Sequence, residues 1–512
     1  MSTQPQTGAL GERKLSTIHA VAQALAIGPM FSIAIVESSI SRPDIGASWN
    51  ATLAVLVASL GVMAIGYVVA LFARRFAGAG AVYEYLTRGA HPSVGIFASG
   101  LYFVGTLFLG GGGIFLGLGI LINQFWTAHI SATGAPDWWI LALIMLVFVL
   151  ALNYLGVRIA IRAMLAFAAI ALVPMLILGI VIVAKGGHGG NTLTMFDPGQ
   201  TSLFGVAGGG VLGGVLLGIL LFVGFEAAAS IGEESHDPHR SIPRAVLWTV
   251  AAAGALFTFM AYAFSIGYGH AAVVKGAWAF DPASVDTMGT RYVGSWFATI
   301  LDVIVILDAT ALALAICVTI GRGYFALGRD GLLPKVFAKT SRFDTPWVGN
   351  LMVAVGGVGL ILLSTGAHYG TLFGSVTGGK FVPSFPNDEF ATFIMAATVG
   401  SFAVELVYLM LGAGALWLLY KTNGKPWQYL VAVIAIATPV LGFYGALHPA
   451  PHNTSNYNYI ALYFTFGVIA LSALWFVVCR LVYPQRVANA ATHASEHRGV
   501  PPLDEAVDFT AT

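Results

Sequence analysis

Long apolar stretches separated by short polar segments run through almost the whole of this 512-residue chain. A helix that crosses a lipid bilayer needs about 20 mostly apolar residues, and the intervals between charged residues supply such lengths repeatedly, as in 138–157 and 245–274. The pattern predicts an all-α integral membrane protein with twelve spans. The expected spans are 15–38, 50–73, 95–125, 138–155, 160–184, 204–232, 243–268, 295–324, 346–365, 389–420, 427–447 and 458–483.

Basic residues are spread unevenly over the loops between these spans. If the N-terminus lies in the cytoplasm, 19 of the 24 Lys and Arg residues fall on the cytoplasmic side. The five on the other side are Arg42, Lys185, Lys275, Arg291 and Lys380. Cytoplasmic loops carry an excess of Lys and Arg, and one missed helix would exchange the sides of every later loop. The distribution therefore supports twelve spans in the cytoplasmic membrane, with cytoplasmic tails at 1–14 and at 484–512, the latter expected to be mostly disordered.

Composition narrows the class of protein further. The chain is 57% hydrophobic and only 9% charged, whereas charged residues make up about 25% of a soluble domain. The net charge of +1 provides no field that would gather nucleic acid. Cys317 and Cys479 lie far apart inside apolar runs, which argues against a disulfide framework or a metal site built on cysteine. We expect a lipid-solvated protein without cofactor or metal.

Two spans carry signs of a broken helix. In the first, Gly28-Pro29 lies at mid-span, where the proline removes a backbone donor and frees carbonyl groups. In the sixth, Gly224 lies two residues before the carboxylate of Glu226. Broken backbone at membrane depth survives only where protein or water surrounds it. Either these are a proline kink and a packing glycine, or they mark a site at the interface of two inverted repeats.

Three segments carry recognisable motifs. Residues 74–85 contain an Arg-Arg pair, two spaced glycines and Tyr-x-Tyr, with Ala77 where a proline is usual in the family below. Gly224-Phe225-Glu226 followed by 232–245 forms the second, and 321–334 forms the third. Together they resemble the amino acid-polyamine-organocation superfamily of secondary transporters, over about residues 15–483. The major facilitator fold, another twelve-span architecture, has a charged motif between helices two and three that is replaced here.

The resemblance implies the leucine-transporter-like fold, a five-plus-five inverted repeat with helices one and six broken. The first repeat would cover 15–185, the second 204–420, and helices eleven and twelve 427–483. The substrate site would lie at the shared midplane. By analogy it would be lined by Ala26, Ile27, Gly28, Pro29, Met30, Gly110, Gly113, Leu220, Phe222, Val223, Gly224, Phe225 and Ile316.

Two stretches of this implied site leave alternatives open. Family members that bind α-amino acids offer successive backbone N–H groups of helix one to the substrate carboxylate, and Pro29 has none. That cradle either survives as Ala26, Ile27 and Gly28 or is lost, which would favour an amine, polyamine or other substrate without an α-carboxylate. In helix three, the glycine run 110–113 leaves either a roomy pocket or very tight packing against helix eight.

Ionisable groups inside the spans are costly and therefore candidates for function. Glu226 is expected to accept hydrogen bonds from freed backbone N–H groups as a structural or coupling carboxylate. Asp308, near mid-membrane in helix eight, is either a proton-coupling site or a buried acid hydrogen-bonded to a broken helix. Glu405 in helix ten is a third candidate for coupling or gating. Glu37 and Asp302 lie nearer the outer ends and are expected to be solvated vestibule charges.

The nature of the coupling solute is inferred mainly from missing residues. Some family members carry a proton-bearing lysine midway along helix five, but 163–184 contains no charge. Sodium sites of this fold use hydroxyl groups on helix eight, and 308–317 offers only Thr310. Coupling to a proton through a carboxylate, or exchange against a counter-substrate, remains. In the loops, charged side chains either set the topology or form ion pairs that hold an inner gate shut: Glu233, Glu234, Arg240, Arg244, Arg322 and Arg329.

The sequence therefore favours a secondary transporter, monomeric or homodimeric, that moves an amino acid or related amine by alternating access. Two other functions stay open: a solute sensor with a transporter fold but no flux, and a permease for a different organic cation or polyamine. An intramembrane enzyme is disfavoured, because the chain has no His-Glu-x-x-His and the spans have no Gly-x-Ser-x-Gly motif.

Overall fold

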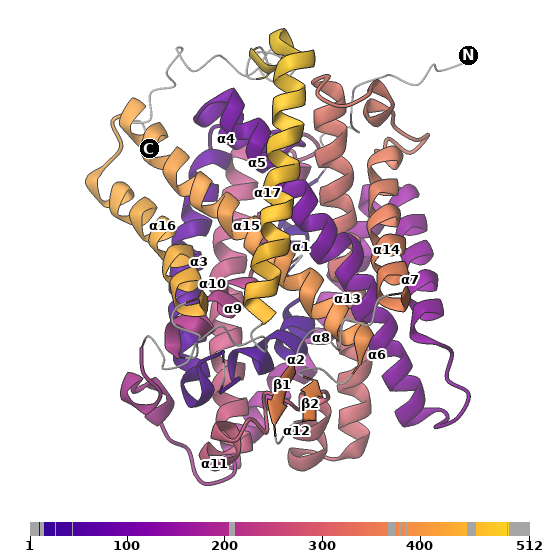
Figure 1. The fold of residues 1–512 in the computed structure, drawn as a ribbon, viewed down its shortest axis with the longest axis vertical. Coiled ribbons are helices and arrows are strands. Elements are labelled where there is room, and N and C mark those ends of the chain that lie inside the picture. Colours follow the sequence, from indigo (N-terminus) through magenta and orange to yellow (C-terminus); the bar gives the residue numbers. More distant parts are fainter. Residues whose placement is uncertain are drawn as a thin grey trace.

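The computed structural model describes residues 10, 15–25, 27–43, 45–203, 210–366, 374–377, 380–383, 387–447, 457–488 and 490. Ala26, nearly all of the 1–14 segment and the tail beyond residue 490 lie outside this range, as does the start of the expected sixth span. Long helices run side by side along the long axis of the molecule (Figure 1). Apolar helices suit a bilayer because they satisfy their own backbone hydrogen bonds.

The helices of the first half are α1 (Thr17–Ala24), α2 (Pro29–Ile40), α3 (Ala51–Ala73), α4 (Val82–Gly89), α5 (Pro92–Thr106), α6 (Ile114–His129), α7 (Trp138–Tyr154) and α8 (Val157–Ala184). A π-helical segment, Leu107–Gly113, joins α5 to α6. Short 3₁₀ turns cover Ser48–Asn50, Thr194–Phe196 and Pro198–Gln200.

The second half contains α9 (Val211–Leu220), α10 (Pro238–Tyr268), α11 (His270–Val274), α12 (Ser284–Tyr292), α13 (Ser295–Arg329), α14 (Trp347–Gly366), α15 (Asp388–Lys421), α16 (Pro426–Leu447) and α17 (Tyr457–Val482). 3₁₀ helices cover Phe225–Ile231 and Lys335–Ala338. The expected all-α architecture is confirmed in its spans, and one short antiparallel hairpin, β1 (Gly374–Thr377) and β2 (Lys380–Pro383), adds to it. The hairpin lies in a glycine-rich loop that periodicity cannot assign.

Eleven helical segments in the described part of the chain are long and apolar enough to cross a membrane. The remaining apolar helix, α7, has 17 residues. Every expected span contains helix, with ends that differ from the expected ones by a few residues. Beyond the end of α17, residues 484–488 form a separate helical segment, and Arg486 donates a hydrogen bond to the Gly331 carbonyl, so the start of the tail is ordered, contrary to the expectation.

Burial distinguishes central from peripheral helices. The most apolar stretch of α13 is 78% buried, whereas the most apolar stretch of Tyr459–Val482 in α17 is 22% buried. Hydroxyl groups inside the spans bond the carbonyl four residues earlier, as Thr106 and Thr310 do, so they leave no unsatisfied donor in an apolar setting. The helix α13 is therefore a central scaffold, and the groups on it are held in place by neighbours on several sides.

Candidate functional site

The first span is interrupted in its middle. Helix α1 ends at Ala24 and α2 begins at Pro29, with Gly28 between them at φ 53°. A Cβ at Gly28 would lie 2.8 Å from Cδ2 of Leu312 on α13, so both the left-handed backbone and the close contact require glycine. Proline at the first helical position suits the start of α2, where its missing N–H would have no partner within the helix.

The start of α2 is capped by a carboxylate from α13. Oδ2 of Asp308 accepts hydrogen bonds from the backbone N–H of Met30 at 2.8 Å and of Phe31 at 3.0 Å. The side chain is buried, with 1% exposed. A helix N-terminus carries unsatisfied donors and a partial positive charge, so Asp308 stabilises the interruption. Of the two alternatives for Asp308, the structure shows the hydrogen bonds to a broken helix; proton coupling through it stays a prediction.

A second interruption follows α9. Residues Leu221 to Gly224 form turns before the 3₁₀ helix Phe225–Ile231, and Gly224 has φ 118°. Oε2 of Glu226 accepts a hydrogen bond from the Gly224 N–H at 3.1 Å, the kind of backbone contact that the sequence suggested. Its two oxygens also accept from the hydroxyl groups of Tyr102 at 3.0 Å and Tyr408 at 2.8 Å. Glu226 thus ties the interrupted span to α5 and α15.

Sequence reasoning missed both tyrosines and one glutamine that joins two helices. The Gln23 amide of α1 donates to the Ala315 carbonyl at 2.8 Å and to Thr319 Oγ1 at 3.1 Å. Each of these polar groups lies within an apolar run, which was the available signal. Glu405 is fully buried on α15 and accepts from Ser401 Oγ at 2.9 Å, so it does not share the Asp308 contact with α2.

The glycines of helix three are packed rather than open. A Cβ at Gly110 would overlap two carbon atoms of Ile316 on α13, and one at Gly112 would overlap Leu360 of α14. Close contact between membrane helices needs such small residues. Of the two alternatives, tight packing against α13 is therefore what the structure shows at Gly110 and Ile316, and Gly113 is also buried.

The remaining candidate residues of the sixth span point to different neighbours. Phe225 packs near Tyr408, with ring centroids 5.8 Å apart. Phe222 instead packs edge-on against Phe257 of α10 at 5.1 Å. Val223 is buried and Leu220 is partly buried. The structure thus brings Gly224, Phe225 and Glu226 together with α15, while Phe222 faces α10.

A pocket of about 290 Å³ lies between the middle of α2, the last turns of α6, the start of α12 and the first turns of α13. Its polar lining includes Gln124, Ser284, Asp286 and Asp302, and His129 Nε2 lies 2.9 Å from Asp302 Oδ2. Asp302 is partly exposed and lines this pocket, which we call the vestibule pocket, in keeping with a solvated charge. Glu37 does not: its side chain is fully buried, and neither carboxyl oxygen has a hydrogen-bond partner among the described residues. The expectation of a solvated charge was wrong there, because α2 turns that position into the bundle.

Near the C-terminal end of α13, Arg322 and Arg329 form ion pairs with Glu234 and Glu233. We call the end of the molecule that carries these ion pairs the arginine-rich face. Arg322 donates to both carboxylate oxygens of Glu234, at 2.7 and 2.9 Å, and both side chains are almost fully buried. Arg329 binds Glu233 in the same bidentate way, at 2.8 and 2.9 Å. The Leu15 N–H bonds the Glu234 carbonyl at 2.9 Å. Ion pairs are thus present between the turn that follows Ile231 and the helix α13, and their role in holding a gate shut stays a prediction.

Two further acids of this face are buried beside Arg329. Tyr83 donates to Oδ2 of Asp330 at 2.8 Å, and Glu84 accepts from the Gly80 N–H at 3.0 Å and lies 4.0 Å from Arg88. Burial raises the pKa of Glu84 to about 7 and that of Asp330 to about 7, each with a carboxylate neighbour adding to the effect and Arg329 opposing it.

The sign of the resulting pH dependence follows from the direction of these shifts. Because both pKa values lie above the ordinary values of 4.5 and 3.8, the closed cluster holds protons more tightly than hydrated acids would. The stability that these two acids give to the closed cluster is therefore fully present in acid, and it is lost as the pH rises through about 7.

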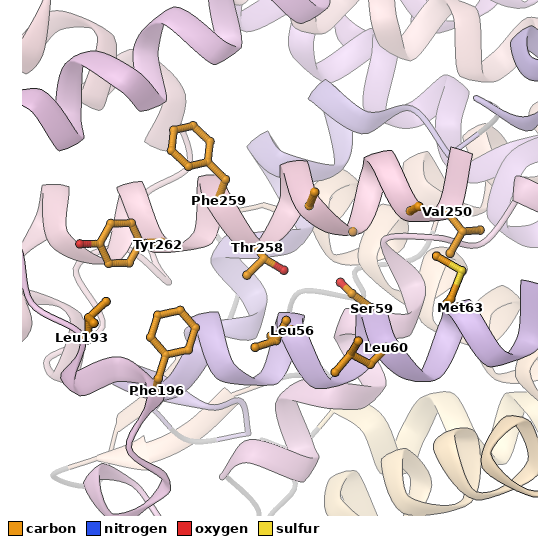
Figure 2. A pocket seen from close by; sticks show the side chains of 13 residues that line it. Leu56, Ser59, Leu60, Met63, Leu193, Phe196, Val250, Thr258, Phe259 and Tyr262 are labelled. Carbon is orange, nitrogen blue, oxygen red and sulfur yellow. The ribbon is translucent and has the colours of Figure 1, made fainter. Parts of the chain in front are cut away.

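A second, larger hollow of about 570 Å³ lies between α3 and α10. Figure 2 shows Ser59 and Met63 of α3 on the side of Thr258 and Val250 of α10, while the Phe259 ring points away from α3. Its lining is almost wholly apolar, and the Leu60 side chain is 65% exposed. Such a surface suits contact with lipid and offers no charged group to a polar solute.

Comparison with known proteins identifies the family. The family described as "Amino acid permease" matches residues 20–476. The methylthioribose transporter of Bacillus subtilis is 30% identical over 44% of this chain and 49% of its own length. The lysine-specific permease of Lactococcus lactis is 28% identical over 50% and 52%. The low-affinity putrescine importer of Escherichia coli is 23% identical over 60% and 66%.

These matches span about half to two thirds of the relatives' own lengths. The family match covers far more of this chain, from the first interrupted span to the last helix. The chain is therefore a multi-pass membrane protein that belongs to the amino acid permease family, within the amino acid-polyamine-organocation superfamily.

Proposed function

We propose that this protein is a secondary permease that moves a small amino acid or amine across the cytoplasmic membrane by alternating access. Twelve spans with both termini in the cytoplasm would place the arginine-rich face inside, in keeping with the uneven distribution of basic residues. Residues 15–185 and 204–420 would form the inverted repeats. Relatives that carry methylthioribose, lysine or putrescine in their names support small polar solutes as the substrate class.

The observation that carries this proposal is the pair of interrupted helices, each held by a buried carboxylate. Asp308 caps the start of α2, and Glu226 bonds the backbone at Gly224. Each interruption costs backbone hydrogen bonds inside a bilayer. Two such interruptions on central helices suit a binding site at the interface of two repeats, and a purely structural protein would gain nothing from them.

The arrangement also supports one conformation of an alternating-access cycle. Ion pairs close the arginine-rich face, while the pocket beside Asp302 lies at the opposite end of α13. A solute would enter from the pocket side and leave after the ion pairs separate. Glu226, bonded to both α5 and α15, is suited to coupling movement of the interrupted span to its neighbours, with a proton or a counter-substrate as the driving solute.

The test is solute flux in liposomes that contain the purified protein. Labelled leucine, lysine, putrescine and methylthioribose are offered with an inward proton gradient, and separately against the same solute preloaded inside. We expect at least one solute to accumulate about fivefold or more above protein-free liposomes. Flux under the gradient alone indicates proton coupling, and flux only after preloading indicates exchange. If a folded protein moves no solute under either condition, transport is refuted; saturable binding without flux would indicate a sensor.

A further inference from the structure

The first turn of α2 has no backbone donor left for a ligand. Pro29 carries no N–H. The N–H groups of Met30 and Phe31 both bind Asp308, and that of Ser32 binds the Gly28 carbonyl at 2.8 Å. A helix N-terminus is otherwise a ready site for a carboxylate or phosphate. Here the protein's own carboxylate fills that site.

The charge of Asp308 works against a second anion at the same place. Two carboxylates in one buried site repel each other strongly because the surroundings screen poorly. A cation meets the opposite situation. Both hydrogen bonds to Asp308 use Oδ2, and Oδ1 accepts none from the residues that the structure describes. One carboxylate oxygen is thus available to an N–H donor of a bound solute.

The pocket that leads toward Asp308 also favours cations over anions. The vestibule pocket includes Val305 and Ile306 of α13 and Ala34 and Ile35 of α2, so it ends within about one helical turn of Asp308 and Phe31. Its charged lining consists of Asp286 and Asp302, and the His129 imidazole lies beside Asp302. A vestibule lined by carboxylates raises the local concentration of cations and lowers that of anions.

We propose that Asp308 acts as the carboxylate of this binding site, so that the transported solute is an organic amine without a carboxylate of its own. The solute's ammonium group pairs with Oδ1 of Asp308, while Oδ2 stays on α2. Asp308 is then a specificity-determining residue. This inference rests on the proposed transport function for its physiological meaning, but its binding test does not depend on flux.

The experiment compares each amine with the amino acid that has the same side chain and a carboxylate. The pairs are putrescine and ornithine, agmatine and arginine, and isoamylamine and leucine. Binding to the detergent-solubilised full chain is measured by thermal shift and titration calorimetry, since a ligand stabilises the state that it binds. We expect at least one amine to bind tenfold or more tightly than its parent amino acid. Equal or tighter binding of the parents, or no binding by any amine, overturns the inference.

Two variants test the role of Asp308 itself. Asp308→Asn removes the charge, and amine affinity should fall at least tenfold. Asp308→Ala also frees the two N–H groups of α2, and the parent amino acids should gain affinity relative to the amines. Asp137→Asn, the same change at an exposed position outside the pocket, should leave the preference within about threefold of the original. An unchanged preference in the Asp308 variants refutes the assignment; if they do not fold, the comparison in the unaltered protein decides.

The outcomes separate this inference from the transport function. Flux of leucine or lysine with preference for the amino acid keeps the permease and refutes the role of Asp308. Tight, carboxylate-averse amine binding without flux supports Asp308 and refutes transport.

Discussion

Removing the buried partner of Glu234 should open the arginine-rich face. Arg322 and Glu234 are 2% and 3% exposed and make two hydrogen bonds of 2.7 and 2.9 Å. Arg322→Gln leaves Glu234 buried without its countercharge, a change that costs about 3–5 kcal/mol in buried pairs. At about 1.4 kcal/mol for each factor of ten, the ratio of closed to open molecules should fall by roughly two to three and a half orders of magnitude.

The native thiol of Cys317 provides the assay. Cys317 is fully buried on α13, five residues before Arg322, so a membrane-impermeant maleimide reacts with it only when the structure opens. In a Cys479→Ser background, the labelling rate follows the open population when reclosing is fast. We expect the rate to rise at least a hundredfold in Arg322→Gln.

A double variant separates the lost attraction from the uncompensated charge. Replacing Arg322 by Met and Glu234 by Leu removes both charges and should restore most of the slow labelling, because a buried ion pair contributes little beyond an apolar pair of similar volume. A labelling rate in Arg322→Gln that matches the unaltered chain would refute the reasoning, as would a double variant that labels as fast as the single one.

Three further outcomes are expected. Glu226→Gln should lower the flux at least tenfold while the protein stays folded in the membrane, because its hydrogen bonds to two tyrosines and Gly224 lose their charged acceptor; unaltered flux contradicts the role. Labelling of Cys317, divided at each pH by the rate of a free thiol because the thiolate is the reacting species, should speed up as the pH rises through about 7, when Glu84 and Asp330 ionise. Glu84→Gln should flatten that normalised profile; a normalised rate that rises toward acid would reverse the sign. Gly110→Ala should destabilise the protein by about 1–3 kcal/mol because of the clash with Ile316, and Ile316→Ala should rescue it in thermal melts; no rescue argues against the packing.

Much of the fold follows from apolar length alone. Each expected span contains a helix because about 20 apolar residues between charges leave few other ways to satisfy the backbone in lipid. The amphipathic helices α4 and α12 and the β1–β2 hairpin were not expected, since they lie in loops where charged and polar residues interrupt any long apolar run. Periodicity also did not reveal that Glu37 points into the bundle.

The sequence allowed several residues of the site to be predicted, but not the contacts between them. A buried aspartate and a Gly-Pro break mark candidate positions, but no spacing connects Asp308 to Met30 and Phe31 across 278 and 277 residues. Tyr102 and Tyr408 likewise reach Glu226 from distant spans. Such contacts depend on tertiary packing, which places helices far apart in sequence beside one another. The glycine run at 110–113 was compatible with a roomy pocket and with tight helix packing, and only the position of its neighbours decided between them.

Alternating access requires the arginine-rich face to open while a solute is being moved. Spin labels at Arg240, whose side chain is 73% exposed, and at the exposed Lys335 report the distance between the start of α10 and the loop after α13, once Cys317 and Cys479 are replaced. Double electron–electron resonance spectroscopy in lipid nanodiscs should show one narrow distance between the two labels without solute. When a transported solute is added, a second distance that is longer by several ångströms should appear. A single unchanged distance under all solute and pH conditions, in protein that still moves solute, would contradict the account.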